Sequence, residues 1–111
     1  MYRKYNTLEE RFMANSVAQW NTALQSYCWI WVGARVEARS QAYGKLNVHI
    51  AGKGHTQLLA HRAAFEVFKG EKVPHGFEVD HACGIGLCIA PDHLKAMPHR
   101  ENMLLHYQRK R

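Results

Sequence analysis

A cluster of metal-ligating residue types constrains this chain more than any other feature. The segment HACGIGLCIAPDH, residues 81–93, places two cysteines five residues apart and a histidine five residues after the second. Thiolate and imidazole are ligands that zinc prefers, and structural zinc sites are closed by four ligands in a tetrahedron. Cys28 is the one other cysteine of the chain, and it could join Cys83, Cys88 and His93 as the fourth ligand.

An alternative interpretation leaves the cysteines without a metal. In it, Cys28 is a small buried hydrophobe beside Trp29, and the two loop cysteines are incidental thiols. The length of 111 residues favours the metal, because a single modest core gives a domain of this size little stability in reserve. Gly84 and Gly86 also fit a backbone that wraps closely around an ion.

The composition indicates a folded, basic protein. Apolar residues make up 47% and charged residues 22% of the chain, which is typical of a globular domain. The formal net charge of +6 suggests a polyanionic partner, nucleic acid first, although a basic, well-solvated surface gives the same total. With no apolar run near the ~18 residues of a membrane helix and no signal peptide, we expect no membrane partner and a cytoplasmic location. Three cysteines in a reducing compartment favour metal binding or free thiols over disulfides.

The N-terminal segment is expected to be a helical arm. Thr7 is placed to cap a helix, and Glu10 follows three residues later, which is the spacing of a capping box. Leu8 and Phe12 stand at helical spacing. The pattern therefore predicts a helix that runs in two pieces to Leu24.

Strands are expected in the next part of the chain. The run YCWIWVG and the alternation in AYGKLNVHI are typical of strands, and TQLLA returns after the turn AGKGH. Between the first two, ARVEARSQ is interpreted as an exposed loop. Further on, HRAAFEVFKG has one apolar face and a lysine and glycine at its end, which predicts a helix. FEVD is long enough for one short strand, and residues 99–107 are expected to form a C-terminal helix.

His81 has no place on the predicted zinc site. It follows Asp80 at the end of the short predicted strand, where the loop begins. Histidine is the usual general base near neutral pH, and one held beside a metal-bound substrate could take that role. The alternative is an ordinary surface or capping histidine, so the residue needs supporting evidence.

Several motifs in order supply that evidence. The segment VDHACGIGLCIAPDHLKAMPHRENM resembles the motif of HNH nucleases, the ββα-metal superfamily. Within it, the similarity is to the zinc-bearing branch that includes the His-Cys box homing endonucleases and many small phage proteins. The upstream runs CWIWVGAR, AYGKLNV and LAHRAAFEVFKG resemble the usual start of the small phage type. The resemblance extends from about residue 11 to residue 102.

The resemblance implies a fold and a domain organisation. The fold class is α+β, with a ββα-metal (HNH) core at residues 77–107, an N-terminal helix, a small antiparallel sheet and one structural zinc. The whole chain, residues 1–111, is then a single nuclease domain. Its helical arm is residues 1–25, its strands for DNA contact are residues 28–59, and its basic tail is residues 108–111.

The resemblance also implies a role for each site residue. His81 matches the general base that activates water. Asp80 and Asn102 match the ligands of a catalytic Mg²⁺ or other divalent cation, and Asn102 follows His81 by 21 positions as in that motif. His106, four residues after Asn102, shares its helix face and could reach the metal or a phosphate. The zinc set of the His-Cys box branch matches Cys28, Cys83, Cys88 and His93.

The implied function is a metal-dependent DNA endonuclease or nickase, in its most specific version a freestanding phage-type homing endonuclease. The partner is double-stranded DNA, the protein is a monomer or a homodimer, and the location is the host cytoplasm if a phage encodes it. His61 could brace the site or be a packed core histidine. The candidate DNA contacts are Lys45, Lys53, His55, Arg62, Arg100, Arg109, Lys110 and Arg111.

The chain departs from the family pattern at two points. Ala90 stands where many relatives carry an asparagine that braces the loop, and the turn AGKGHT is shorter than in His-Cys box enzymes. Two rival functions remain open. One is a non-catalytic, zinc-stabilised DNA-binding module, which would need neither His81 nor Asn102. The other is a structure-selective or packaging-associated nuclease with the same site.

Overall fold

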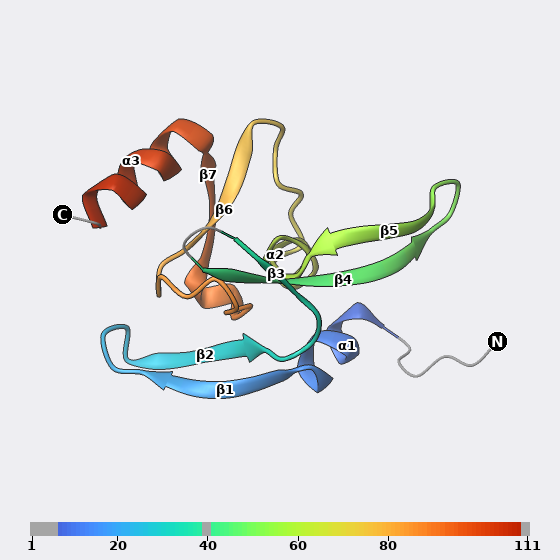
Figure 1. The fold of residues 1–111 in the computed structure, drawn as a ribbon, viewed down its shortest axis with the longest axis horizontal. Coiled ribbons are helices and arrows are strands. Elements are labelled where there is room, and N and C mark those ends of the chain that lie inside the picture. Colours follow the sequence, from blue (N-terminus) through green and yellow to red (C-terminus); the bar gives the residue numbers. More distant parts are fainter. Residues whose placement is uncertain (1–6, 39–40, 110–111) are drawn as a thin grey trace.

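The computed structural model describes residues 7–38 and 41–109, and Figure 1 shows their arrangement. The described residues form three α-helices, one short 3-10 helix and seven strands. The longest described helix has 11 residues, and none of the helices in these ranges is long and apolar enough to cross a membrane. In chain order the elements are α1 (Leu8–Ala14), β1 (Ser16–Asn21), β2 (Ser26–Trp31), β3 (Arg35–Glu37), β4 (Ala42–Ile50), β5 (Gly54–Leu59), α2 (Ala60–Lys69), β6 (Phe77–His81), η1 (Pro91–His93), β7 (Leu94–Pro98) and α3 (His99–Arg109).

The strands form three small antiparallel sheets. β1 pairs with β2, β3 and β5 lie on either side of β4, and β6 pairs with β7. In Figure 1 the β1–β2 hairpin lies along the lower edge, and the β4–β5 hairpin extends to the right. The predicted α+β class with small antiparallel pairing is therefore confirmed.

The N-terminal arm is only partly helical. The Thr7 hydroxyl accepts a hydrogen bond from the Glu10 backbone N–H at 3.1 Å, as the capping box predicts. However, α1 ends at Ala14, and the prediction of a second helical piece running to Leu24 is wrong. Residues 16–21 instead form β1, because each of them pairs with a residue of the aromatic, β-branched strand β2. Pairing with the next strand of the same hairpin decides this structure.

A second difference lies in the segment predicted to be an exposed loop. Residues Arg35–Glu37 form the short edge strand β3, in which Val36 pairs with Tyr43 of β4. The predicted strands at β2, β4, β5 and β6 and the predicted helices at α2 and α3 are confirmed. β7 has no clear strand pattern of its own and ends in Pro98, a residue that strand interiors exclude.

Helix α2 packs at the centre of the core. It contributes the buried side chains of Ala60, Ala63, Ala64 and Phe65, and it ends at Gly70, whose φ of 69° is the left-handed conformation that suits glycine. Because three of the five buried residues of α2 are alanines, the helix can approach its neighbours closely. Other elements complete the same core with Phe12, Trp31, Leu46, Val73, Val79, Ile89 and Leu94.

The C-terminal part has the order strand, loop, strand, helix. The β6–β7 pairing runs from Phe77 opposite Pro98 to His81 opposite Leu94. Helix α3 begins at His99, directly after β7, and contacts both strands. This order places the end of β6 beside the helix (Figure 1).

Phe12→Ala is expected to lower the free energy of unfolding by about 3–5 kcal/mol. The Phe12 side chain is fully buried, and its ring lies 6.0 Å from that of Trp31 and 5.8 Å from that of Phe68 between centroids. Urea denaturation measures the change. Met13→Ala is the matched control in the same helix, because Met13 is 52% exposed and its loss should cost less than about 0.5 kcal/mol. Equal losses in the two variants would contradict this core.

Candidate metal centre and active site

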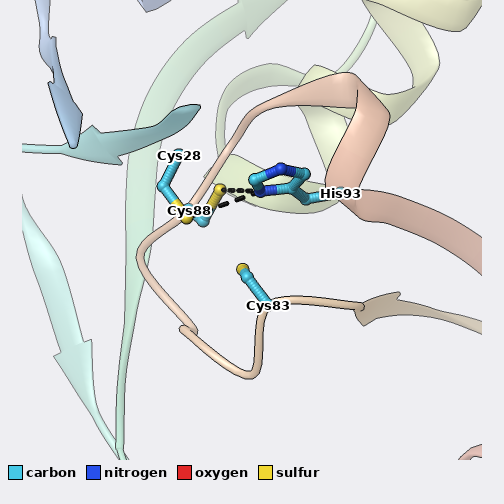
Figure 2. Close-up of side chains that lie close together, drawn as sticks. All are labelled: Cys28, Cys83, Cys88 and His93. Carbon is cyan, nitrogen blue, oxygen red and sulfur yellow. Dashed lines mark hydrogen bonds between the residues drawn. The ribbon is translucent and has the colours of Figure 1, made fainter. Parts of the chain in front are cut away.

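Four side chains converge on one point from three parts of the chain (Figure 2). Cys28 comes from β2, Cys83 and Cys88 from the loop after β6, and His93 from η1. Their ligand atoms all lie within 4.8 Å of one another. The cluster expected from the spacing of the cysteines and the histidine therefore forms, and it could hold a metal ion.

Two distances in the cluster match those around a tetrahedral ion. Nδ1 of His93 lies 3.4 Å from the Cys28 sulfur and 3.5 Å from the Cys88 sulfur. Zinc bonds of about 2.3 Å to sulfur and about 2.0–2.1 Å to nitrogen, at a tetrahedral angle, place the two ligand atoms about 3.6 Å apart. His93 therefore lies at coordination spacing from both Cys28 and Cys88, and the Cys83 sulfur lies within 4.8 Å of the other ligand atoms.

Ser26 completes the surroundings of His93. The Ser26 hydroxyl lies 2.6 Å from Nε2 of His93, on the opposite side of the ring from the sulfurs. When Nδ1 binds a metal, Nε2 carries the proton. The Nε2–H group then donates a hydrogen bond to this hydroxyl, which fixes the ring orientation. Sequence reasoning missed Ser26, although its position two residues before Cys28 on a strand places both side chains on one face.

The loop that carries two of the ligands is held against β2 by backbone hydrogen bonds. Trp31 N–H donates to Leu87 C=O, and Ile89 N–H donates to Trp29 C=O, both at 2.8 Å. Gly86 passes so close to β4 that a Cβ at this position would collide with a backbone carbonyl oxygen. These contacts order the loop through its backbone.

Ala90, where many relatives carry asparagine, is buried and packs with Cys28 and Cys88. A side chain that could brace the loop by hydrogen bonds is thus replaced by an apolar contact beside the cluster. The other departure from the family pattern, the short turn between β4 and β5, lies in a hairpin away from this loop (Figure 1).

Of the three thiols, Cys83 has a lowered pKa and the other two have raised pKa values. A hydrogen bond from Cys88 lowers the pKa of Cys83 to about 5, whereas burial raises the pKa of Cys28. The hydrogen bond to Cys83, together with burial, raises the pKa of Cys88. Three thiolates confined to one buried site repel one another, and a bound cation is the ordinary means of holding them deprotonated.

A cavity of about 560 Å³ opens beside the end of β6. It is bounded by β6, the first turn of α2, the middle of α3, the last residue of β5 and one residue of β4. The structure thus brings three sequence-predicted residues, His81, Asn102 and His106, into one pocket together with Arg62. The full lining is Tyr43, Leu59, His61, Arg62, Glu78, Val79, His81, Asn102, Met103, His106 and Tyr107.

Asp80 is not among the residues that line this pocket. Its side chain is 4% exposed, and its Oδ1 lies 3.5 Å from Nε2 of His106. The structure therefore places His106 next to Asp80, one turn along α3 from Asn102, as the shared helix face predicts.

Asn102 is oriented by a residue that sequence reasoning missed. Its Nδ2 donates to the Glu78 carboxylate at 2.8 Å, and its Oδ1 is buried with no hydrogen-bond partner within the described ranges. His99 Nδ1 lies 2.8 Å from the other Glu78 oxygen. Although burial opposes it, the hydrogen bonds from Asn102 and His99 lower the pKa of Glu78, which keeps this carboxylate ionised. The amide oxygen of Asn102 could thus act as a ligand of a cation.

The His61 ring packs against the His81 ring at an interplanar angle of 44°. The two ring centroids are 4.6 Å apart, and the Tyr43 ring lies 5.4 Å from His61 and 6.1 Å from His81. Burial, together with the smaller effects of the charges of His81 and Arg62, lowers the pKa of His61 to about 3. His61 is therefore both packed and part of the pocket wall, and it is neutral at physiological pH.

The remaining sequence-predicted residues are scattered. Arg100 is exposed in the first turn of α3. Lys45 is half-buried on β4, Lys53 is exposed in the turn after it, and His55 is exposed on β5 with its ring 5.6 Å from that of His49. The backbone of Arg109 ends α3, but its side chain, together with Lys110 and Arg111, lies outside the described residues.

The model of the HNH endonuclease family matches residues 58–104. The matched segment contains Asp80, His81, Asn102 and three of the four cluster residues, and it begins just before α2. The resemblance to HNH endonucleases is confirmed over this segment. A search of curated proteins and a search of solved structures found no match.

Cys83→Ser is expected to remove a bound metal ion and to lower the melting temperature, because metal binding in such a cluster contributes directly to folding. Elemental analysis of the purified protein and thermal denaturation measure the two effects. Ser26→Ala keeps all four ligands and should weaken metal affinity by about 10–100-fold, as read by competition with a chelator. An unchanged metal content and melting temperature in Cys83→Ser would exclude this centre.

The His61 ring should remain neutral when the protein is acidified to pH 5. Its folded pKa of about 3 lies below the ordinary value of 6.5, so protonation favours the unfolded state. Stability from this residue is present above pH 6.5 and is lost as the pH falls toward 3. NMR of the histidine rings, assigned with His61→Phe, measures the titration. A midpoint near 6.5 for His61 would contradict the burial of a neutral ring.

Proposed function

We propose that this protein is a metal-dependent DNA endonuclease that hydrolyses phosphodiester bonds. The observation that carries the proposal is the convergence of His81, Asn102 and His106 on one pocket, with Asp80 behind it, within the segment that matches HNH endonucleases. A DNA-binding module would need the metal cluster and a basic surface but not this set.

His81 is the proposed general base. Its ring lines the pocket and is packed against the His61 ring at 4.6 Å, so its orientation is restricted. A neutral imidazole can take a proton from a water molecule as that water attacks phosphorus. The neutral state of His61 matters here, because it leaves a polar but uncharged ring beside the base.

Asp80 and Asn102 are the proposed ligands of a catalytic Mg²⁺ or similar cation. The residues fit such an ion: Asn102 Oδ1 is a buried oxygen with no hydrogen-bond partner in the part of the chain described, and Asp80 is a buried carboxylate. Oxygen ligands are those that Mg²⁺ prefers. When bound, the ion would stabilise the negative charge that develops on the phosphate and on the leaving oxygen. His106, at 3.5 Å from Asp80, is placed to orient that carboxylate or to contact a phosphate.

Zinc is the proposed occupant of the separate cluster. Three cysteines and one histidine are a ligand set typical of structural zinc, and they leave no position for a substrate. The two metal sites use different residues, so their roles are distinct: the cluster holds the loop, and the pocket performs the chemistry.

Double-stranded DNA is the proposed substrate. The net charge is +6, Arg62 lies at the pocket, and an antiparallel β-ribbon such as β4–β5 can enter the major groove. Lys45, Lys53 and His55 on that ribbon, with Arg100 on α3, are the proposed phosphate contacts, as are Arg109, Lys110 and Arg111. A freestanding phage-type homing endonuclease in the host cytoplasm is the most specific form of the proposal.

His81→Ala is expected to lower cleavage of supercoiled plasmid by about 10²–10⁴-fold in the presence of Mg²⁺, the usual contribution of a general base. Its fold and its DNA affinity should be retained. His75→Ala is the matched control, because His75 is exposed in the loop before β6 and outside the pocket. The ratio of nicked and linear products to remaining plasmid, followed over time, gives the rates.

Full activity of His81→Ala would remove His81 as the base. If wild-type protein binds DNA but cleaves neither plasmids nor a random-sequence library, the non-catalytic module is favoured. Cleavage confined to branched substrates would favour the structure-selective nuclease.

A further inference from the structure

The β1–β2 hairpin differs in chemistry from the rest of this basic chain. Residues 15–34 contain no charged side chain and no histidine, although the chain has 15 Lys and Arg, 9 Asp and Glu, and 8 His. Contacts to the phosphates of a nucleic acid need cations. The hairpin is therefore not built as part of a phosphate-binding face.

Large apolar side chains are exposed on this hairpin. Val17 is 57% exposed, Trp20 is 50% exposed and Tyr27 is 55% exposed. Trp20 and Tyr27 lie directly opposite each other across the two strands, with ring centroids 5.0 Å apart. Side chains alternate between the two faces of a strand, so Val17 lies on the other face of the hairpin from Trp20, and apolar side chains are exposed on both faces.

The outer edge of β1 is also open. β2 is paired on both sides, with β1 on one side and with the loop segment around Cys88 on the other. β1 itself pairs with β2 and with no other strand of residues 7–38 and 41–109. Proteins usually protect such an edge with lysine, proline or a bulge, whereas β1 carries neither residue and its register with β2 is continuous. In Figure 1 it is the outermost strand at the lower edge.

We propose that β1 pairs antiparallel with β1 of a second copy of this chain across a two-fold axis, so that the hairpin is a dimer interface. A two-fold contact uses the same patch on both partners. The backbone N–H and C=O groups on the open edge of each β1 then form hydrogen bonds with those of the other. One four-stranded sheet in the order β2–β1–β1–β2 results, with no open β1 edge.

Charge favours a second copy as the occupant. Two chains that each carry +6 repel one another over most of their surfaces. Their approach costs least where neither chain carries a charge, and residues 15–34 are such a region. The same neutrality gives an acidic or a basic partner no ion pair to form.

The pairing leaves the pocket accessible. Figure 1 places β1 at the lower edge of the molecule and α3, which lines the pocket, at the upper edge. A dimer would therefore carry two outward pockets. If the proposed nuclease function is correct, such a dimer could cut both strands of a duplex; the pairing itself does not depend on that function.

Sedimentation velocity of three proteins tests the proposal: wild type, Val17→Lys and Leu104→Lys. Wild type is expected to sediment at twice the mass of one chain, and Val17→Lys as a monomer at the same concentration, since a lysine on the edge strand blocks pairing. Leu104→Lys is the matched control, because Leu104 is 56% exposed but lies on α3, and it should remain dimeric. Circular dichroism checks that each variant is folded.

A wild-type chain that is monomeric from micromolar to submillimolar concentration overturns the proposal, and quenching of Trp20 fluorescence by single-stranded oligonucleotide would then assign the hairpin to base stacking. A dimer that survives both Val17→Lys and Ala18→Lys also overturns it. Should both variants unfold, hydrogen exchange of wild type decides: β1 amides must become more protected as concentration rises, and protection that is independent of concentration overturns the pairing.

Discussion

The attachment of the ligand-bearing loop to β2 is the interaction on which the rest of the structure depends. Cys28 and His93 are 65 positions apart in the chain, yet their side chains meet at 3.4 Å. Backbone hydrogen bonds between β2 and the loop reinforce the same contact. The N-terminal hairpin and the C-terminal strand, loop and helix are thereby joined at one point, and the pocket is built on the far end of the same loop.

The parts of the fold that could be predicted are those whose signals are local. The Thr7 cap, the apolar face of α2 and its end at Gly70 are each determined by residues within one or two turns. The metal cluster was equally accessible, because cysteine is rare in this chain and its three copies all serve the cluster. The positions of Asp80 and Asn102 followed from a motif.

The parts that could not be predicted depend on contacts between different elements. β1 is a strand because β2 lies beside it, and the segment alone gave no decisive pattern. Glu78 was missed because its role is visible only when α3 brings Asn102 within 2.8 Å of it. His61 was ambiguous for the same reason, since its packing against His81 requires α2 and β6 to be in place.

The loop has a further consequence, because its two ends are fastened to each other. Ala82 N–H donates to the His93 carbonyl at 2.8 Å, and Gly84 N–H donates to the His81 carbonyl at 2.9 Å. A metal ligand and the proposed base thus share one short stretch of hydrogen-bonded backbone. Occupancy of the cluster and order in the pocket are then linked equilibria, and linkage is reciprocal. Under the proposed function, a nucleic acid that orders the pocket around His81 would therefore also raise the affinity of the cluster for its ion.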